Sequence, residues 1–352
     1  MRPAGLQARS AFLRFTGFDS LAQIGVFYLC RFAEGERPVR RFVDSYRAHP
    51  AGLEHDLHVI FKGFSSTTSL GAAQALFTDL PFHSIELEDK GYDIASYFAA
   101  AALVTNPRLI FFNTFAELLA DDWLKKFADA LDQPGVGLVG ATGSWQSPRS
   151  LYVARVKRGL NWVRHPLDYL NYLGRLRAEP LAGNGDRSPP RSGTAGDATS
   201  VHARQMLRRL SGSVYDLLRF DHYLHYVPYP NPHVRTNAFM IERDRFLALR
   251  ASSFRTKFGV YKFESGRQSL TQQVLKQGLR PVVVDRYGRI YEMADWKLSS
   301  TYWIDQQANL IVADNRTRDY AEGSRQFRAR LQAHAWEHPS SWSGQRGFSA
   351  RR

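Results

Sequence analysis

The sequence predicts an α/β fold, a mainly parallel sheet flanked by helices and interrupted by a basic helical insertion. Apolar runs typical of buried strands take turns with helical patterns between about residues 24 and 142. These strand runs are continuously apolar, as in parallel sheets that helices cover on both faces. The chain has 352 residues, of which 44% are hydrophobic and 23% are charged. This is the composition of a globular protein that is long enough to bury an enzyme-sized core.

Strands and helices are expected to alternate through the first part of the chain. The expected strands are 24–32, 57–64, 83–89, 108–114 and 136–142. The expected helices are 38–50, 69–80, 94–104 and 121–131. Pro38 is expected to open the first helix and Ser69 to cap the second, because Pro suits a first helical turn and a Ser hydroxyl accepts from free N–H groups there. Together residues 20–150 are expected to form one α/β half of a domain.

The composition changes after about residue 150. Residues 151–178 and 201–220 predict basic amphipathic helices, and the Pro-, Gly- and Ser-rich residues 180–200 predict a flexible linker. Residues 151–220 carry 12 basic and five acidic side chains. Their net charge of +7 is half of the net charge of the chain, which is +14. We therefore expect a basic helical insertion over 151–232. Its basic helices at 151–178 and 201–220 could lie on an anionic membrane surface or form a solvated cover over a cleft.

Ordered patterning resumes after the insertion. The expected elements are a strand at 234–241, a helix at 244–250, a helix at 269–279, and a strand and turn at 280–292. Ser269 and Gln272 have the spacing of a capping box, and Gly278 stands at the end of that helix. Residues 233–320 are expected to complete the same domain, with a basic tail over 321–352.

Several classes of protein are excluded or disfavoured by what the sequence lacks. Cys30 is the single cysteine, so the chain has no internal disulfide framework and no cysteine-based zinc site. It contains no GxGxxG after the first strand, no GKS/T, no GxSxG and no HExxH. No apolar run reaches the length of a membrane span, and no cleavage site follows the short run at 21–30. We expect a cytoplasmic protein.

Polar residues stand where the expected strands end. Lys62, Asn113 and Thr114 stand in the last residues of the second and fourth strands, and Gly91 and Asp93 follow the third. Ligands of open α/β sheets bind at the carboxyl ends of the strands, so these residues are candidates for binding. Each also has a plain structural interpretation, such as a helix cap for Asp93 or a tight turn at Gly91.

Four segments together resemble the GT-A glycosyltransferases, in particular the inverting family 2-like and rhamnan-synthesis-like bacterial enzymes. The segments are 88–101, 109–127, 136–147 and 263–284, and the resemblance covers about 24–145 and 233–290, with a further likeness at 305–320. It implies a GT-A fold and a transferase that moves a sugar from a nucleotide-sugar to a bacterial glycan or glycolipid acceptor. The implied role is cell-surface polysaccharide biosynthesis, in the cytoplasm or peripherally at the inner membrane.

The resemblance places the donor at the strand ends. It implies that Gly91 and Asp93 lie near the nucleotide, with Lys62 as a further donor-binding residue. Where the family has an Asp-x-Asp metal motif, this chain reads Asn113-Thr114-Phe115. Phe115 offers no oxygen ligand to Mg²⁺ or Mn²⁺, so metal dependence stays open, while Asn113 and Thr114 can hydrogen-bond a ribose or a diphosphate.

The resemblance places the catalytic base late in the chain. Where the family has Glu-Asp, this chain reads Glu264-Ser265, in an expected loop just before a helix, so Glu264 takes the role of general base. A plain alternative for Glu264 is a carboxylate stabilised by a helix N-terminus. Without a metal, the departing diphosphate would need cations, and the candidates are Arg235, Lys262 and Arg267. The acceptor candidates are Trp145, His233 and Asn237.

Two other functions remain open at this stage. The differences in both carboxylate motifs allow a non-catalytic nucleotide-sugar or glycan-binding protein of the same fold. The positive charge alone suggests a nucleic-acid-binding protein, but the sequence lacks aromatic-basic RNA motifs and a recognition helix. We therefore expect no nucleic-acid partner.

Overall fold

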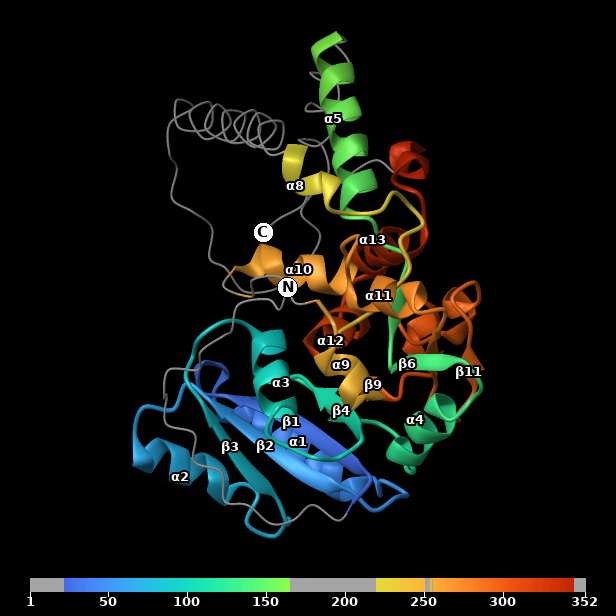
Figure 1. Ribbon diagram of the computed structural model, residues 1–352. Coiled ribbons are helices and arrows are strands. Elements are labelled where there is room, and N and C mark those ends of the chain that lie inside the picture. The colour runs from blue at the N-terminus through green and yellow to red at the C-terminus, as the bar shows by residue number, and fades with distance from the viewer. Residues whose placement is uncertain (1–21, 165–219, 251–253, 255, 345–352) are drawn as a thin grey trace, which may run out of the picture.

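The core of the protein is a twisted sheet with helices on both faces (Figure 1). The computed structural model describes residues 22–164, 220–250, 254 and 256–344. Within this part the central sheet has eight strands in the order β11-β10-β6-β9-β4-β1-β2-β3. Its strands are β1 (Ile24–Arg31), β2 (Asp56–Lys62), β3 (His83–Leu87), β4 (Arg108–Phe112), β6 (Val136–Gly140), β9 (Ala238–Glu242), β10 (Arg280–Val284) and β11 (Ile290–Tyr291). The predicted fold class, a mainly parallel α/β sheet flanked by helices, is confirmed.

The strands of the central sheet are parallel in part, and β9 runs against its two neighbours. β1 pairs in parallel with β2 and β4, and β6 pairs in parallel with β10. β9 lies between β4 and β6 and is antiparallel to both. The chain returns to the sheet at its carboxyl edge, where the N–H of Asn113, just after β4, donates to the carbonyl of Asn237, just before β9 (3.0 Å).

The helices form two layers because side chains alternate along each strand. The helices that pack on the sheet are α1 (Glu36–Ala48), α2 (Thr67–Ala75), α3 (Asp93–Ala101), α4 (Trp123–Leu131), α9 (Arg243–Leu247), α10 (Lys257–Ser265) and α11 (Leu270–Lys276). Tyr28 of β1 belongs to the apolar cluster that contains α1 and α4. Its neighbour Phe27 belongs to the cluster that contains α3, α9, α10 and α11.

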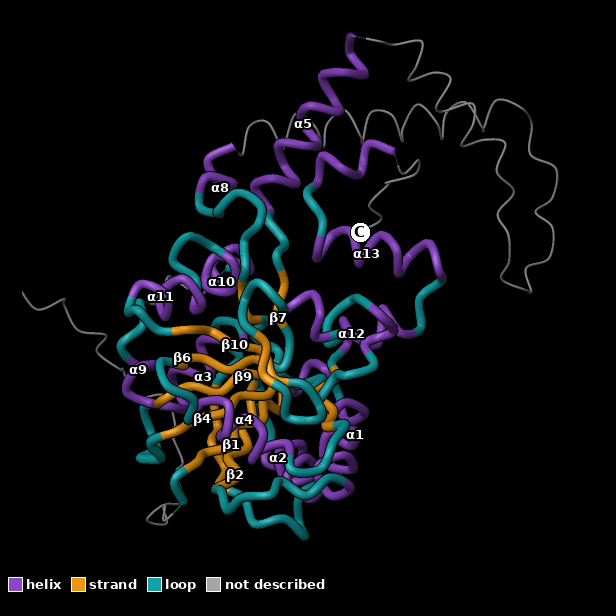
Figure 2. Tube along the Cα trace, turned by 90° about the vertical axis from the view of Figure 1, so that its right-hand side faces the viewer, coloured by secondary structure: helices purple, strands orange, loops and turns teal. Residues whose placement is uncertain are grey.

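The remaining elements lie at the carboxyl edge of the sheet (Figure 2). Two small antiparallel pairs are β5 (Glu117–Leu118) with β12 (Val312–Ala313), and β7 (Gly143–Ser144) with β8 (His233–Val234). The helices here are α5 (Pro148–Arg164), α8 (Phe220–Leu224), α12 (Asn315–Ala321) and α13 (Arg325–Trp336). The 3₁₀ turns are η1 (Phe32–Glu34), η2 (Trp296–Ser299), η3 (Asp305–Gln307) and η4 (Pro339–Gly344). None of the described helices is both long and apolar enough to cross a bilayer.

The starts of two helices differ from the prediction. α1 begins at Glu36, so Pro38 is its third residue and not its first. Pro is tolerated there because N–H groups of the first turn have no partner within the helix. Ser66, not Ser69, caps α2, because the Ser66 hydroxyl accepts from the Ser69 N–H (3.4 Å). The predicted cap of α11 is confirmed, since the Ser269 hydroxyl accepts from the Gln272 N–H (3.3 Å).

Two predictions around the later motifs are wrong. Glu264 lies in the last turn of α10 and not in a loop, because the Thr256 side chain caps a helix over Lys257–Ser265. The expected strand 234–241 is divided into β8, which pairs with β7, and β9, which pairs with β4 and β6 in the central sheet. The predicted linker at 180–200 and most of the predicted helices at 151–178 and 201–220 lie outside the described residues.

Candidate functional site

A cavity of about 660 Å³ lies where β8, α10, α12 and α13 meet α5 and α8. Its described lining combines aromatic rings with charged groups. The rings belong to Tyr152, Tyr223, Tyr226, Phe258, Tyr261 and Trp303. The charged and histidine side chains are Arg155, His222, His233, Arg235, Lys257, Glu264, Arg316 and His334. This volume and mixture are typical of a small-molecule site.

Glu264 is the single carboxylate in the described lining of this cavity. The residue is 8% exposed, and its Oε1 lies 3.4 Å from both the Arg235 Nε and the Thr236 N–H. α10 is anchored next to it by Phe263, whose ring meets that of Phe98 on α3 (5.7 Å). The carboxylate is therefore held in a packed position and still borders the cavity. It does not lie at a helix N-terminus, so the plain alternative of dipole stabilisation does not apply.

Arg235 balances the charge of Glu264. Burial by itself lowers the pKa of the Arg235 guanidinium, but the charges of Glu264 and, less strongly, Tyr302 and Asp314 raise it above its ordinary value. The guanidinium also lies over the Tyr302 ring, 5.1 Å from its centroid. Tyr302 is buried, and its hydroxyl has no hydrogen-bond partner among the described residues. Arg235 is thus a fixed cation beside the carboxylate.

His233 is neutral at physiological pH. Burial lowers its pKa to about 4, an effect that Glu264 opposes and Arg235 reinforces. Its Nδ1 lies 2.8 Å from the Asn231 carbonyl, which can only accept, so Nδ1 carries the proton and Nε2 has the lone pair. Burial likewise lowers the pKa of His334 to about 4. Neither imidazole adds positive charge to the cavity near pH 7.

The ends of β2 and β3 form a second polar group. Lys62 is 1% exposed, and its Nζ donates to the Gly91 carbonyl (2.7 Å). Burial lowers the pKa of Lys62 and raises that of Asp93, the first residue of α3, while each charge partly offsets the shift of the other. Gly91 has a φ of +68°, and a Cβ there would lie 2.8 Å from the Ala95 Cβ. The turn thus requires glycine and holds the Lys62 amine close to α3.

Beside these residues, Arg31 at the end of β1 pairs with Asp89 and Glu34 (both 3.1 Å). Its contact with Asp89 is bidentate, since Nε also donates to the same carboxylate (3.2 Å). The charges of Arg31, Lys62, Asp89 and Asp93 influence one another, as the shifted pKa values of all four show. The strand ends therefore bear a compact charged cluster and no isolated phosphate-binding cation.

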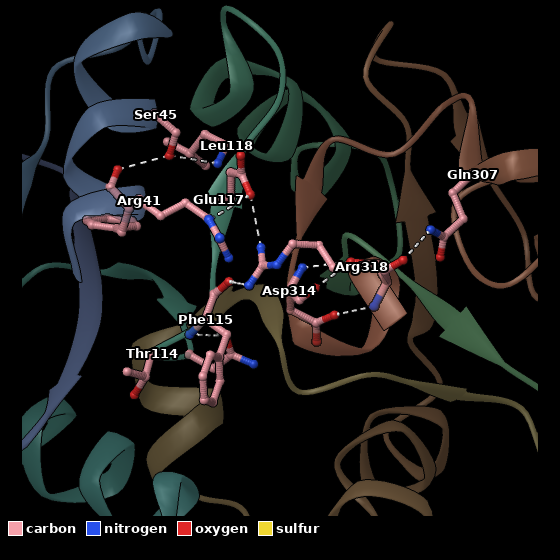
Figure 3. Close-up of polar contacts among 12 residues, drawn as sticks. Arg41, Ser45, Thr114, Phe115, Glu117, Leu118, Gln307, Asp314 and Arg318 are labelled. Atoms are coloured by element: carbon pink, nitrogen blue, oxygen red, sulfur yellow. Dashed lines mark hydrogen bonds and ion pairs between the residues drawn. The ribbon is translucent and has the colours of Figure 1, made fainter. Parts of the chain in front are cut away.

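The end of β4 is closed by hydrogen bonds within the chain (Figure 3). The Asn113 Oδ1 accepts from the Phe115 N–H (3.0 Å), and Thr114 is buried. Arg318 of α12 donates to the Phe115 carbonyl (3.0 Å) and pairs with Glu117 (2.9 Å). These side chains meet because β5 pairs with β12, which brings the start of α12 to the end of β4.

The residues at the end of β4 do not fit a divalent cation. The nearest carboxylate in this segment, Glu117, is engaged by the guanidiniums of Arg318 and Arg41, the latter at 3.6 Å. The Asn113 oxygen is already used in the local turn. In the described part of the chain, no group of three His, Cys, Asp or Glu side chains could hold a metal ion. We therefore derive no catalytic step through a metal.

The end of β4 and the Glu264 carboxylate meet at the same short backbone segment. Asn113 bonds the carbonyl of Asn237, and Glu264 accepts from the N–H of the preceding residue, Thr236. On the other side, Gly91 lies close to Phe254, whose ring packs on Phe263 of α10 (5.4 Å). The described lining of the cavity does not include the donor candidates Lys62, Gly91, Asp93, Asn113 and Thr114. They lie at the ends of β2, β3 and β4, outside that lining.

The other predicted residues take mainly packing positions. The Trp145 indole N–H donates to the Met293 carbonyl (3.1 Å), and its ring meets Trp336 (5.5 Å). The Asn237 Oδ1 accepts from Thr142 (2.9 Å), and its buried Nδ2 has no partner among the described residues.

Of the three cations predicted near the leaving group, only Arg235 borders the cavity. The Lys262 Nζ lies over the Phe258 ring, 4.9 Å from its centroid. Arg267 is exposed and donates to the Leu224 carbonyl (2.8 Å). The Lys262 contact lies within α10, whereas Arg267 joins the segment after α10 to the end of α8.

Sequence reasoning missed the arginines that α12 supplies. Arg316 lines the cavity, and Arg318 reaches the end of β4. The signal was the resemblance of 305–320 to the C-terminal part of related chains, together with the spacing of two arginines after Asp314. It assigned no role to either residue, because the contact depends on the β5–β12 pairing.

The structure thus combines a mainly parallel α/β sheet, polar residues at the carboxyl ends of its strands, and a cavity bordered by a buried carboxylate. Solved structures similar to the chain include a mannosyltransferase, TarS and a glucosyl-3-phosphoglycerate synthase. No family model matches the sequence, and none of the curated proteins does.

The similar structures match about a third of this chain. The mannosyltransferase PcManGT from Pyrobaculum calidifontis, solved with GDP-Man and Mn²⁺, is 15% identical over 35% of each chain, with a TM-score of 0.29. S. aureus TarS with UDP-GlcNAc is 14% identical over 33% of each chain, with a TM-score of 0.28. Glucosyl-3-phosphoglycerate synthase from Mycobacterium tuberculosis, solved with Mn²⁺, UDP and phosphoglyceric acid, is 15% identical over 33% of this chain and 42% of its own, with a TM-score of 0.26. This chain therefore spans well under two thirds of each of them, and the function has to be argued from its own residues.

Proposed function

We propose that this protein is an inverting glycosyltransferase that moves a hexose from a nucleotide-sugar donor to a bacterial surface glycan or glycolipid. The observation that carries the proposal is the buried Glu264 carboxylate, which borders a cavity of about 660 Å³ and accepts from the Thr236 N–H in the segment before β9. A carboxylate so placed is suited to accept a proton from a hydroxyl bound in the cavity.

The reaction needs an in-line displacement at the sugar C1. Glu264 takes the proton of the acceptor hydroxyl, the acceptor oxygen bonds to C1, and the bond from C1 to the diphosphate oxygen breaks with its electron pair on the diphosphate. The polar residues at the ends of β2, β3 and β4 would hold the nucleotide, with Lys62 and Asp93 as the charged members. Attack from the cavity side opposite the leaving group inverts the configuration at C1.

The departing diphosphate needs positive charge. Arg235 is held beside Glu264, and Arg318 lies at the end of β4, where a diphosphate between the two regions would meet both. Guanidinium groups bind phosphate oxygens bidentately and can stabilise this charge without a metal. In this assignment Arg318 supplements Arg235, while Lys262 and Arg267 have a smaller part because of where their side chains lie.

Kinetics of Glu264 variants test the proposal. Glu264→Gln keeps the shape and loses the basic oxygen, so we expect transfer to fall by about 10²- to 10⁴-fold while the Kd for the donor stays the same. Glu264→Asp should retain part of the activity. Glu322→Gln, at an exposed position of the described surface, is the matched control and should behave as the wild type.

Donor consumption is measured over a panel of UDP-, GDP- and dTDP-sugars. Normal turnover by Glu264→Gln would remove Glu264 from the mechanism. Donor binding by the wild type without any consumption or transfer would instead identify a nucleotide-sugar-binding protein of the same fold.

A further inference from the structure

We propose that the cavity beside Glu264 selects a saccharide with two free hydroxyls, one that meets Glu264 and one that donates to the Nε2 of His233. The inference rests on the proposed function, because it identifies this saccharide as the acceptor. It goes further in assigning a second contact of that acceptor, which determines which of its hydroxyls is turned toward Glu264.

The imidazole of His233 has one nitrogen that the fold uses and one that it leaves to the cavity. Its Nδ1 donates to the Asn231 carbonyl (2.8 Å). Within the described part of the chain, no hydrogen bond reaches its Nε2, and this atom is not completely enclosed by protein. The residue is 1% exposed and belongs to the cavity lining. Its Nε2 is therefore a hydrogen-bonding group on the cavity wall.

This Nε2 can only accept a hydrogen bond at neutral pH. Burial lowers the pKa of His233 to about 4, so the ring carries a single proton, which the Asn231 carbonyl keeps on Nδ1. A ligand has to bring a donor to this atom, and the donors of a saccharide ring are its hydroxyls. A ring that lacks a hydroxyl at this point would leave Nε2 without a partner, which lowers the affinity.

One buried residue fixes His233 and Glu264 relative to each other. The Asn231 side chain is wholly buried, and its Nδ2 donates to the carbonyl of Ser265, directly after Glu264 (2.8 Å). The backbone carbonyl of the same Asn231 accepts from His233. From the other side, His233 of β8 pairs with Ser144 of β7. The two acceptor groups are thus held in a fixed relation, which suits recognition of a pair of hydroxyls on one ring.

A hydroxyl of the donor sugar is a second source of the same chemistry, and the arrangement favours the acceptor. The general base has to meet the acceptor hydroxyl, and His233 lines the same cavity as Glu264. The strand-end residues proposed to hold the donor lie outside that described lining. His233 is therefore assigned to the acceptor.

Binding of methyl hexosides to the full chain tests the proposal. The methyl α-glycosides of glucose, galactose and mannose are titrated by ligand-observed NMR. The one that binds most tightly is then compared with its monodeoxy analogues, each of which lacks one hydroxyl. In His233→Asn this parent glycoside should bind about fivefold more weakly than in the wild type, as for one lost hydrogen bond. One analogue should lose no affinity in this variant, because it already lacks the donor to His233. Glu264→Gln should single out a different analogue, which lacks the reacting hydroxyl.

Two substitutions of His233 separate the roles of its two nitrogens. The Asn amide matches the position of Nδ1 and can keep the bond to the Asn231 carbonyl, whereas the Gln amide matches the position of Nε2 and can offer an acceptor to the cavity. His233→Gln should therefore bind the parent glycoside nearly as well as the wild type. A purely structural role would give the opposite order. His338→Asn, at an exposed position, is the control and should bind as the wild type.

Several results would overturn the proposal. One is that none of the methyl glycosides binds, and another is that His233→Asn weakens the parent and all of its analogues equally. Selection of the same analogue by His233→Asn and Glu264→Gln would show a single hydroxyl contact. Weaker binding of a nucleotide-sugar to His233→Asn, with unchanged binding of its nucleoside diphosphate, would assign the contact to the donor sugar instead.

The two proposals fail in different ways. If the glycosides bind through His233 but no nucleotide-sugar is bound or consumed, the transferase function is wrong and the saccharide site stands. If Glu264→Gln loses transfer while His233→Asn binds the glycosides as the wild type does, the transferase function stands and the second contact is wrong.

Discussion

Glu264 and Arg235 depend on each other, because each would be an unbalanced charge without its partner. Both side chains are less than one fifth exposed, and the Nε–Oε1 distance is 3.4 Å. Removal of one member of a buried pair is more costly than removal of both, since the remaining charge has lost its solvation and its partner. The pair therefore balances the charge of the two side chains beside a partly apolar cavity.

Arg235→Gln should lower the free energy of unfolding by about 3–5 kcal/mol, because Glu264 would remain buried and unpaired. The double variant Arg235→Gln with Glu264→Gln should recover part of that loss. Urea denaturation of the two single variants and the double variant measures the coupling. Strictly additive effects would show that the two side chains do not stabilise each other.

His233 makes stability depend on pH. Its folded-state pKa of about 4 lies below the ordinary value of 6.5, so between these limits the unfolded chain binds more protons. The contribution of His233 to the free energy of unfolding is therefore fully present above pH 6.5. It decreases as the pH falls toward 4, by up to about 3 kcal/mol. His233→Gln should lose less stability over that range than the wild type, in urea titrations at several pH values.

The exposed His338 provides the matched control for this comparison. His338→Gln should keep the wild-type dependence on pH. An unchanged dependence in His233→Gln would show that folding does not lower the pKa of His233.

The sequence predicted the surroundings of Asp93 better than those of Glu264. Asp93 was expected beside a helix at a strand end, and it is the first residue of α3. The burial of Glu264 was not predictable, because it depends on Arg235 and Thr236, which lie about 30 positions earlier in the chain and reach Glu264 only through tertiary structure. Local patterns find helix starts, and they do not find ion pairs of this kind.

At the scale of elements, the β5–β12 pair connects the two halves of the site. β5 directly follows the end of β4, and β12 precedes α12, whose cap is a reciprocal box between Asp314 and Thr317. This arrangement directs Arg318 toward the Phe115 carbonyl and Glu117 (Figure 3). α12 therefore acts as a brace that holds the end of β4.

Arg318→Gln should lower the free energy of unfolding by about 1–3 kcal/mol, since it leaves a partly buried carbonyl and carboxylate without this donor. It should also weaken donor binding if the end of β4 is part of the donor site. Arg40→Gln, on the exposed side of α1, is the control and should change stability by less than about 0.5 kcal/mol. Wild-type stability and donor affinity in Arg318→Gln would contradict the role of α12 as a brace.

α10 shows why one element was missed. The residues before Glu264 have no clear apolar periodicity, and the helix is only nine residues long. Its cap at Thr256 and its packing through Phe263 against Phe98 and Phe254 determine the structure. By contrast, the strands β1, β2 and β4 are almost wholly buried and could be read directly from their apolar runs.

At the scale of the whole molecule, the alternation of strands and helices was enough to predict the sheet, but not its C-terminal cover. Predicting the cover would have required pairing Glu117–Leu118 with Val312–Ala313, two-residue strands far apart in sequence. Such short, distant pairings leave no periodic pattern. The site is built from both parts, so the sequence could indicate its residues only through the family resemblance.

Chelation tests whether the transfer reaction needs a divalent cation. The end of β4 does not fit a divalent cation, since Glu117 is engaged by two guanidiniums. We expect EDTA to leave most of the transfer activity, with arginine charge stabilising the departing diphosphate. Complete loss of activity on chelation that Mn²⁺ restores would show that a metal ion is required.

The central claim is that the strand ends and Glu264 act on the same donor. A crystal structure with the nucleoside diphosphate that binds most tightly among UDP, GDP and dTDP tests it most directly. We expect the nucleoside at the ends of β2 and β3 and the diphosphate between the end of β4 and the cavity that Glu264 borders. A nucleotide bound elsewhere, or with its diphosphate directed away from Glu264 into solvent, would contradict the account.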